Sequence, residues 1–376
     1  MEVIPIEPVS YGKTCRYQIA EGEHIAQGSF GYVYAATITE YGDYVGAPTV
    51  TVKVAHLKKN IFTAEQSRQK LVRRYETLVN IHHDHIAAYH QISIDLTKPG
   101  PDCTVHLMMD YYASGDLAGL LAEFQKHNQL RRNPPHEHFD ASSLMQLDVE
   151  TAAACMSQIA NGLGFLHQNN IVHGDLKPGN IFIRLIQGNE AVREVLVIGD
   201  LDDFIQIEHS SAGTAHLHGS FRYMSPEMCG KYLRDPPTEV GMKTDIWSLG
   251  CIMLEMVNCM MEELWMFDVD KGNKKRGDNV DAESFIRLVE AGFVLLEPKH
   301  TPAGIAEAIR RCLWYDSETR ATAEELLPLL RSPRSKAVKS EERRRRRGPC
   351  YQVLAAVAGL VTFIASCYKL WKYFNE

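Results

Sequence analysis

The segment His173–Asn180, which reads HGDLKPGN, constrains the chain most. It combines an acid at Asp175, a lysine at Lys177 and an amide at its last residue, and apolar residues lie on both sides of it, at 171–172 and 181–183. A loop held between apolar flanks can present several polar groups to one substrate. The segment therefore predicts a rigid functional loop inside a folded domain.

Composition and charge narrow the class of protein. The chain has 376 residues, of which 45% are hydrophobic and 23% charged, as is ordinary for a globular protein longer than one average domain. The net charge of the chain is −7, and the run Arg343–Arg347 alone carries +5. The rest of the chain therefore carries −7 − 5 = −12 and is strongly acidic. An acidic body lacks the surface for general nucleic-acid binding, and no nucleic-acid partner is expected.

Nine cysteines occur without any CxxC pair, which argues against a zinc site or a disulfide framework and favours a reducing cytosolic setting. The histidines at 82, 83 and 85 lack nearby cysteines or suitably spaced carboxylates, so they are interpreted as a solvated loop.

Small residues form a turn in the segment Glu21–Ala36, at Gly28, Ser29 and Gly31, between flanks that are typical of strands. A glycine hairpin lets backbone N–H groups approach phosphate oxygens, although an ordinary hairpin has the same pattern. A strand follows this turn instead of a helix, which argues against a dinucleotide-binding fold.

The alternating segment Pro48–Ala55 predicts a strand that carries Lys53 on a half-buried face. A lysine there needs an anionic partner, because an unpaired buried charge is costly; the alternative is a surface lysine on an edge strand. The next segment, Phe62–Ile81, predicts a helix with Leu71 and Leu78 toward a core.

Downstream of the opening segment, a hairpin with its turn at 187–189 leads into an apolar strand that ends at Asp200. An alternative register would use Asp203 and Phe204. The alternation of Leu196 and Ile198 favours Asp200 as the acid presented at the strand end.

These segments, in this order, resemble the eukaryotic protein kinase family, and in particular its serine/threonine form, in which Lys-Pro-x-Asn follows the acid. The resemblance implies an α+β, two-lobed fold with a β-rich N-lobe over 21–112 and a helical C-lobe over 113–331. Residues 1–20 would be an irregular N-terminal extension.

The resemblance also implies the chemistry, which is transfer of phosphate from Mg²⁺-ATP to serine or threonine hydroxyls of a protein substrate. Asp175 would accept the hydroxyl proton and Lys177 would neutralise the γ-phosphate. Asn180 and Asp200 would bind Mg²⁺.

The nucleotide site is implied in the same way. Lys53 would grip the α- and β-phosphates, Met109 would be the gatekeeper beside the adenine, and Asp116 would lie near the ribose. The full set of expected nucleotide-binding residues is Ala26, Gly28, Ser29, Gly31, Val33, Lys53, Met109, Asp110, Tyr112, Asp116 and Phe182.

The chain departs from the family pattern at several positions. Ala26 replaces the first glycine of the hairpin, Thr51 replaces an alanine, Gly174 replaces an arginine, and Asp202 replaces the glycine of Asp-Phe-Gly. Arg74 falls where the family has the helix glutamate that pairs with the strand lysine, which leaves Glu76 or Glu65 as candidate partners of Lys53. Ala26, Thr51, Asp202 and the unresolved helix glutamate support the alternative of a weakly active or inactive kinase-like membrane scaffold. Gly174 instead suggests activity that does not depend on a phosphorylated activation loop.

Two structural pairs are further implied by the resemblance. Asp245 would hold the backbone of the loop His173–Asn180, because a buried aspartate needs donors. Arg320 would form a buried ion pair with Glu227.

The C-terminal part predicts a membrane anchor. A polar and then basic linker, 332–347, precedes an apolar stretch, 348–370, and a short tail, 371–376; 21 uncharged residues separate Arg347 from Lys369. As a helix these residues would cross the ~30 Å core of a bilayer, with a packed or surface-lying helix as the alternative. The arginine run would keep the kinase on the cytosolic side, and the membrane would be reticular, nuclear-envelope or mitochondrial.

Overall fold

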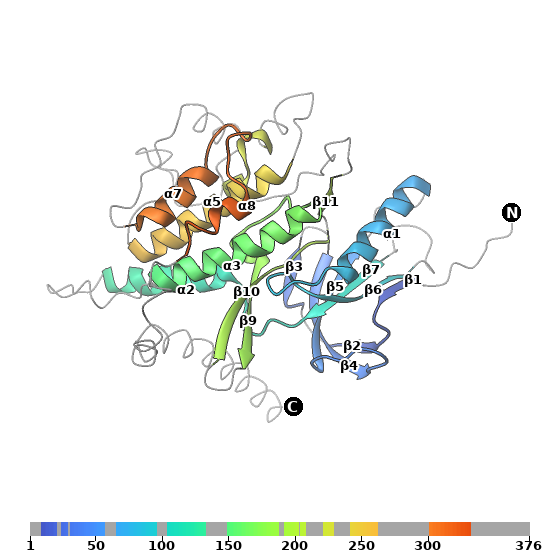
Figure 1. Cartoon of the computed structure of the whole chain (residues 1–376). Helices are drawn as coiled ribbons and strands as arrows, with labels where there is room; N and C mark the ends of the chain where they lie inside the picture. Colours follow the sequence, from blue (N-terminus) through green and yellow to red (C-terminus); the bar gives the residue numbers. More distant parts are fainter. Residues whose placement is uncertain are drawn as a thin grey trace, which may run out of the picture. The chain divides into compact units, whose positions relative to one another are not determined.

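A computed structural model gives the fold (Figure 1), and the residues that it describes are 9–20, 24–28, 31–56, 65–95, 104–132, 149–187, 192–202, 204–207, 221–228, 241–261 and 301–331. The chain divides into two compact units. The first comprises Met1–Tyr112 together with Gly199–Asp203, and the second comprises Ala113–Ile198 and Phe204–Glu376. The chain therefore leaves the first unit and returns to it for one short segment.

The first unit is built on an antiparallel sheet in which seven strands are described, in the order β1-β6-β7-β5-β4-β2 with β3 paired to β4. The strands are β1 (Val9–Gly12), β2 (Arg16–Ile19), β3 (Ala26–Gly28), β4 (Gly31–Glu40), β5 (Thr49–His56), β6 (Tyr89–Asp95) and β7 (Thr104–Asp110). β5, which carries Lys53, lies between β4 and β7 and so is a central strand. The alternative of an edge-strand lysine is wrong.

The expectation that residues 1–20 are irregular is also wrong. β1 pairs with β6 and β2 pairs with β4, so residues 9–19 contribute both ends of the strand order. Each of these strands has only four residues, and β2 alternates between exposed and half-buried positions without a fully buried residue. Backbone pairing with longer neighbours stabilises such strands, and it leaves little trace in the hydrophobic pattern.

Helix α1 (Glu65–Asn80) packs on β6 and β1, as Figure 1 shows. Its buried side chains are Leu71, Tyr75 and Leu78, which recur at helical spacing and form one apolar stripe. This confirms the predicted helix. A second apolar cluster, which includes Val50 and Val52 of β5, packs with Met108 of β7.

The second unit is mainly helical. Among its described residues the α-helices are α2 (Leu117–Arg132), α3 (Val149–Gln168), α5 (Met242–Met261), α7 (Ala303–Cys312) and α8 (Ala323–Leu326). α3 contacts α5, α8 and β10, and it is lined by buried residues such as Met156, Ile159 and Leu163, so it is the central helix of this unit.

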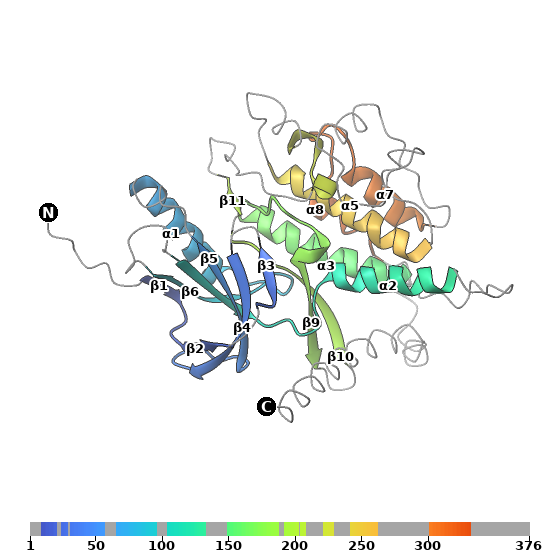
Figure 2. The same ribbon diagram turned by 180° about the vertical axis from the view of Figure 1, so that it is seen from behind.

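Two small strand pairs complete the second unit. β9 (Ile181–Gln187) pairs with β10 (Val192–Ile198), and the views in Figures 1 and 2 both show them side by side. This is the predicted hairpin. β8 (Ile171–Val172) pairs with β11 (Ile205–Gln206), and the opening segment of the sequence lies between β8 and β9.

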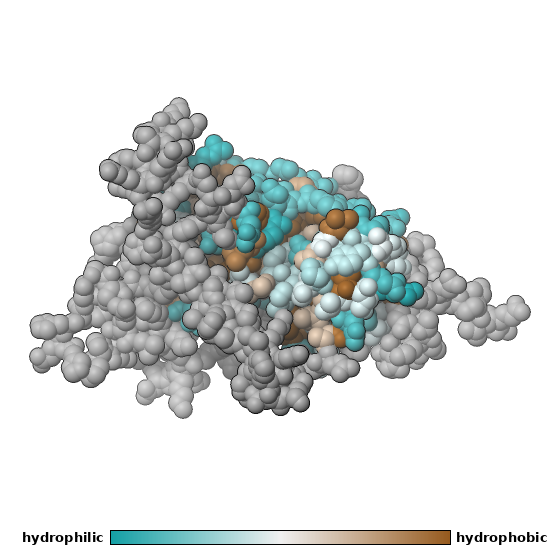
Figure 3. Space-filling view, turned by 90° about the horizontal axis from the view of Figure 1, so that it is seen from below, coloured by the Kyte–Doolittle hydropathy of each residue, from teal (hydrophilic) through white to brown (hydrophobic). Residues whose placement is uncertain are grey.

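On the face drawn in Figure 3, the apolar residues of the described chain are interrupted by polar ones. Among the described residues, no helix has the length and the apolar character needed to cross a membrane. The predicted anchor, 348–370, lies outside the described residues.

Candidate active site

The first unit places Lys53 between two carboxylates. Nζ of Lys53 lies 2.6 Å from Oδ1 of Asp200 and 2.9 Å from Oδ1 of Asp202. The lysine side chain is only 5% exposed, and β5 holds its backbone by pairing Lys53 with Val33 of β4 and Leu107 of β7. The anionic partner that a buried lysine requires is therefore supplied by the segment that returns from the second unit.

The electrostatics of this cluster keep Lys53 charged. Burial by itself lowers the pKa of Lys53, but the carboxylates of Asp202 and Asp200 outweigh it, so the pKa lies above the ordinary lysine value. Burial raises the pKa of the Asp202 carboxyl; the Lys53 ammonium lowers it, and the neighbouring Asp200 carboxylate raises it again. Two acids compete here for one close ammonium group.

The segment that carries both acids is fixed to the sheet. Leu201 is buried, and its backbone N–H donates to the hydroxyl of Tyr89 at 2.8 Å. Burial raises the pKa of Tyr89 well above its ordinary value, and the nearby Asp202 and Asp200 carboxylates add to this, so the hydroxyl stays neutral. Asp200 has a φ of 60°, a left-handed conformation that aspartate tolerates better than most residues.

Helix α1 contributes a basic residue, Arg74, to the surroundings of Lys53, Asp200 and Asp202. Nη1 of Arg74 donates to the backbone oxygen of Asp202 at 3.4 Å. Glu76, one of the two predicted partners of Lys53, is exposed, and the partners found for Lys53 are Asp200 and Asp202. The side chain of Glu65, the other predicted partner, is outside the described residues.

The predicted glycine hairpin is present, since β3 pairs with β4 and places Ala26 opposite Val33 and Gly28 opposite Gly31. A Cβ atom on Gly31 would lie 2.0 Å from the carbonyl oxygen of Val54, so the close approach of β4 to β5 requires glycine there. Ser29 is outside the described residues.

The end of β7 contains the other nucleotide-binding candidates of the first unit. Met109 is buried and pairs with Thr51, while Asp110 pairs with Val50. Oδ1 of Asp110 lies 2.6 Å from Nε2 of His90. Tyr112 is the last residue of this stretch of the first unit.

The second unit brings the catalytic candidates together. Nζ of Lys177 lies 2.6 Å from Oδ2 of Asp175, and Nδ2 of Asn180 donates to the backbone oxygen of Asp175 at 2.8 Å. The next residue, Pro178, restricts Lys177 to an extended conformation, which the structure has at φ −155° and ψ 164°. Pro178 then starts a short 3₁₀ turn that ends at Asn180.

Asp245 holds the backbone just before Asp175. This fully buried carboxylate accepts the N–H of His173 at 2.8 Å and the N–H of Gly174 at 2.9 Å, and Nε2 of His167 lies 3.0 Å from it. The predicted role of Asp245 is thus confirmed. Gly174 has a φ of 78°, which an arginine at this position would adopt only at a cost.

The remaining candidates of the second unit lie next to each other. Asp116 and Phe182 form an isolated bridge between their backbones, and Oδ1 of Asp116 accepts the N–H of Gly119 at 2.8 Å at the start of α2. The sequence predicted that the Asp116 carboxylate lies near the ribose of the nucleotide. The hydrogen bond to Gly119 does not test that contact, which stays a prediction.

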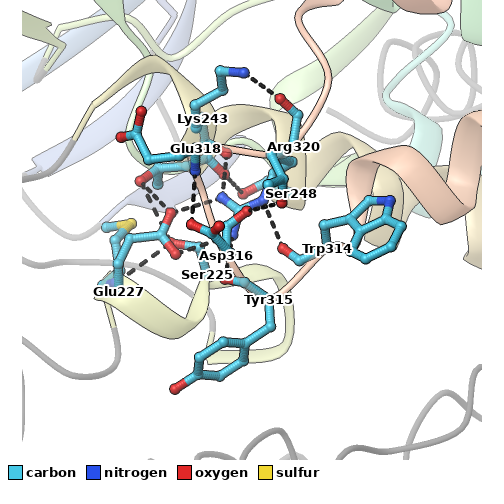
Figure 4. A network of polar contacts seen from close by, with 12 residues as sticks. Ser225, Glu227, Lys243, Ser248, Trp314, Tyr315, Asp316, Glu318 and Arg320 are labelled. Atoms are coloured by element: carbon cyan, nitrogen blue, oxygen red, sulfur yellow. Dashed lines mark hydrogen bonds and ion pairs between the residues drawn. The ribbon is translucent and has the colours of Figure 1, made fainter.

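The predicted ion pair of Arg320 with Glu227 is confirmed, and Figure 4 shows the polar contacts around it. Nη1 of Arg320 lies 2.7 Å from Oε1 of Glu227 and donates to the backbone oxygen of Lys243 at 2.6 Å, while Nε donates to the backbone oxygen of Trp314. The fully enclosed guanidinium therefore ties three separate stretches of chain.

The donor atoms suit Mg²⁺, which prefers oxygen ligands. Nδ2 of Asn180 makes two hydrogen bonds to Asp175, so Oδ1 is the atom that the side chain would offer to a metal ion. The Asp200 side chain is 35% exposed, so a cation from solution can reach its carboxylate. Within the described residues no cluster of three or more histidine, cysteine, aspartate or glutamate side chains forms a metal site by itself.

Two contacts of this site were not predicted from the sequence. The contact of Asp202 with Lys53 crosses 149 residues, and Tyr89 has no motif that marks it as the acceptor for Leu201. The only signals in the sequence were the unusual residues themselves, Asp202 in place of a glycine and Arg74 in place of a glutamate.

Known proteins that are similar to this chain are protein kinases. The protein kinase domain matches residues 19–329. The MAP kinase kinase kinase wis4 of Schizosaccharomyces pombe is 25% identical over 247 residues, which are 65% of this chain and 15% of that protein. The serine/threonine-protein kinase SSK22 of Saccharomyces cerevisiae is 27% identical over 321 residues, 81% of this chain and 20% of that protein.

A human relative, the serine/threonine-protein kinase Nek2, is 27% identical over 201 residues, 52% of this chain and 38% of Nek2. The chain thus spans well under half the length of each of these curated relatives.

Proposed function

Because the chain belongs to the protein kinase family, we propose that it transfers the γ-phosphate of Mg²⁺-ATP to serine or threonine hydroxyls of protein substrates. The observation that carries this proposal is the cluster of Asp175, Lys177 and Asn180, held in one short loop by Asp245. The serine/threonine assignment is supported by the relative SSK22, whose name includes it.

In this proposal Asp175 accepts the proton of the substrate hydroxyl. Its carboxylate is 27% exposed, so an incoming hydroxyl can reach it. Lys177 also supplies positive charge for the phosphate in transfer. Asp245 orients the loop through backbone contacts and does not touch the substrate.

Nucleotide binding is assigned to residues of both units. In the first unit Lys53 would meet the α- and β-phosphates, the backbone of Gly28 and Gly31 would face the phosphates, and Met109 and Asp110 would border the adenine. Asn180 and Asp200 would hold Mg²⁺, which neutralises phosphate charge when bound. The names of the relatives, all kinases, favour this enzyme over the kinase-like scaffold.

The test is phosphate transfer to a general protein substrate by the full chain and by Asp175→Asn. Loss of the proton acceptor is expected to lower kcat by about 10²–10⁴-fold while nucleotide affinity stays within a few fold. Glu123→Gln is the matched control, because it makes the same acid-to-amide change at an exposed position of α2. Equal rates for wild type and Asp175→Asn would contradict the mechanism.

We also propose that the segment 348–370 anchors the kinase to a membrane with the kinase domain in the cytosol. Support comes from its uninterrupted uncharged sequence and from the run Arg343–Arg347 directly before it. Carbonate extraction of membranes from cells that express the chain with or without residues 348–376 tests this. The full chain should stay in the pellet and the shortened chain should be released; release of both would refute the anchor.

A further inference from the structure

Lys53 has two carboxylate partners, although one suffices to neutralise it. Both come from the segment Gly199–Asp203, and one of them, Asp200, is the proposed Mg²⁺ ligand. An oxygen that binds a divalent cation is no longer an equal partner for an ammonium group. The two acids therefore cannot have the same task.

Exposure separates the two carboxylates. The Asp200 side chain is 35% exposed, whereas the Asp202 side chain is 10% exposed, close to the 5% of Lys53 itself. A cation that enters from solution reaches Asp200. Asp202 instead faces Lys53 at 2.9 Å within the protein, where a charge-assisted hydrogen bond is strong.

The backbone around Asp202 is held from both sides. Arg74 donates to the carbonyl oxygen of Asp202, and Tyr89 accepts the N–H of Leu201, the preceding residue. The Leu201 side chain is buried as well. The backbone of Asp202 therefore cannot move away from Lys53 without breaking these contacts.

Helix α1 does not offer a competing acid among its described side chains, 71–80. The one acid of that stretch, Glu76, is exposed, and the residue that reaches the cluster is the base Arg74. Arg74 reaches the cluster through the backbone oxygen of Asp202.

We propose that Asp202 is the positioning residue of Lys53, and that Arg74 in turn holds Asp202 in place. This inference rests on the proposed kinase function, because its purpose is to keep the Lys53 ammonium in the phosphate site while Asp200 serves the metal. In the family pattern helix α1 would supply the acid that pairs with the strand lysine. Here the acid, Asp202, comes from the segment after β10, and helix α1 supplies a basic residue, Arg74.

The first test does not require activity. The full chain, without nucleotide but with Mg²⁺ in excess so that the metal engages Asp200, is treated with acetic anhydride, and the acetylation rate of Lys53 is followed by peptide mass spectrometry with Lys243 as internal reference. Asp202→Asn should acetylate several-fold faster at Lys53 than wild type, because a shielding ion pair is lost. Asp202→Glu should restore most of the protection, and Glu76→Gln, the exposed acid of α1, should leave the rate unchanged.

A second measurement is the affinity for ADP in the presence of Mg²⁺, so that the metal engages Asp200 and Asp202 is left as the carboxylate partner of Lys53. Asp202→Asn should weaken ADP binding about tenfold, the effect of one charge-assisted contact, while Asp202→Glu should bind nearly as wild type. Arg74→Gln should change both readouts in the same direction by a smaller factor, and Arg73→Gln, at the exposed neighbouring position, should change neither.

The outcomes separate the two proposals. Equal Lys53 acetylation in wild type and Asp202→Asn would overturn the role of Asp202, whatever the activity. Protection that depends on Asp202 in a chain that transfers no phosphate would uphold the positioning role and refute the proposed reaction.

Discussion

At the scale of single residues, the surroundings of Tyr17 make the free energy of unfolding decrease as the pH rises in the alkaline range. Its hydroxyl lies 3.0 Å from Nδ1 of His106 on the first sheet, and burial, with a contribution from Cys15, raises the pKa of Tyr17 to about 12. An unfolded tyrosine titrates near ~10, so the folded chain holds this proton more tightly. The stability that this contributes is complete below about pH 10 and is lost as the pH rises through about 12.

Tyr17→Phe removes the ionisable group. The variant should be less stable than wild type at pH 8.5 by about 1 kcal/mol, because the hydrogen bond is lost. At pH 11 the gap should shrink by about 1 kcal/mol, since only wild type is destabilised by the rising pH. Urea unfolding of both proteins at the two pH values measures this, and a gap that does not depend on pH would contradict the assignment.

At the scale of elements, the pairing of β4 with β5 depends on Gly31. A side chain there would meet the Val54 carbonyl oxygen, so Gly31→Ala must separate the two central strands locally. We expect a loss of about 2 kcal/mol in the free energy of unfolding, measured by urea denaturation. Gly241→Ala is the matched control, because a Cβ atom at Gly241 meets no atom within 4 Å.

The link between α5, the turn at Glu227 and the segment before α8 depends on the fork geometry of Arg320. Arg320→Lys keeps the charge but cannot reach Glu227 and the carbonyl oxygens of Lys243 and Trp314 together. A loss of about 3 kcal/mol in unfolding free energy is expected. Arg331→Lys, at an exposed position, should have no measurable effect; equal stability of the two variants would argue against the link.

Prediction from sequence succeeded where local pattern decides structure. The apolar positions Leu71 and Leu78 are enough to place α1, and the sequence of the loop His173–Asn180 fixes its polar cluster, because Pro178 constrains its neighbours. It failed for residues 9–19, whose pairing is made by the backbone. It also could not see that Lys53 meets Asp202, because that contact depends on the return of a distant segment.

At the scale of the whole molecule, the first unit is not contiguous in sequence. A fragment ending at Tyr112 contains the described strands of the sheet and Lys53, but it lacks both carboxylates that neutralise this lysine. An unpaired buried charge is strongly destabilising. We expect the fragment 1–112 to be marginally stable, and Lys53→Met to raise its melting temperature by several degrees, as circular dichroism would show.

In the full chain the same Lys53→Met substitution should lower ADP affinity, because the ammonium group is then missing from the phosphate site. Leu107→Met, a volume-conserving change at the neighbouring strand, serves as the control and should stabilise neither form. A fragment that is no more stable with methionine at position 53 would show that Lys53 finds another neutralising partner without the returning segment.

The discontinuity of the first unit also sets an order of events during synthesis. Lys53 and Asp200 are 147 residues apart in the chain, and a ribosome adding ~5–20 residues per second needs roughly 7–30 s to cover that interval. During that interval Lys53 has been synthesised, but the segment Gly199–Asp203, which carries both of its carboxylate partners, has not. The first unit, although its synthesis begins at residue 1, is complete only when the ribosome has also made residues 113–203.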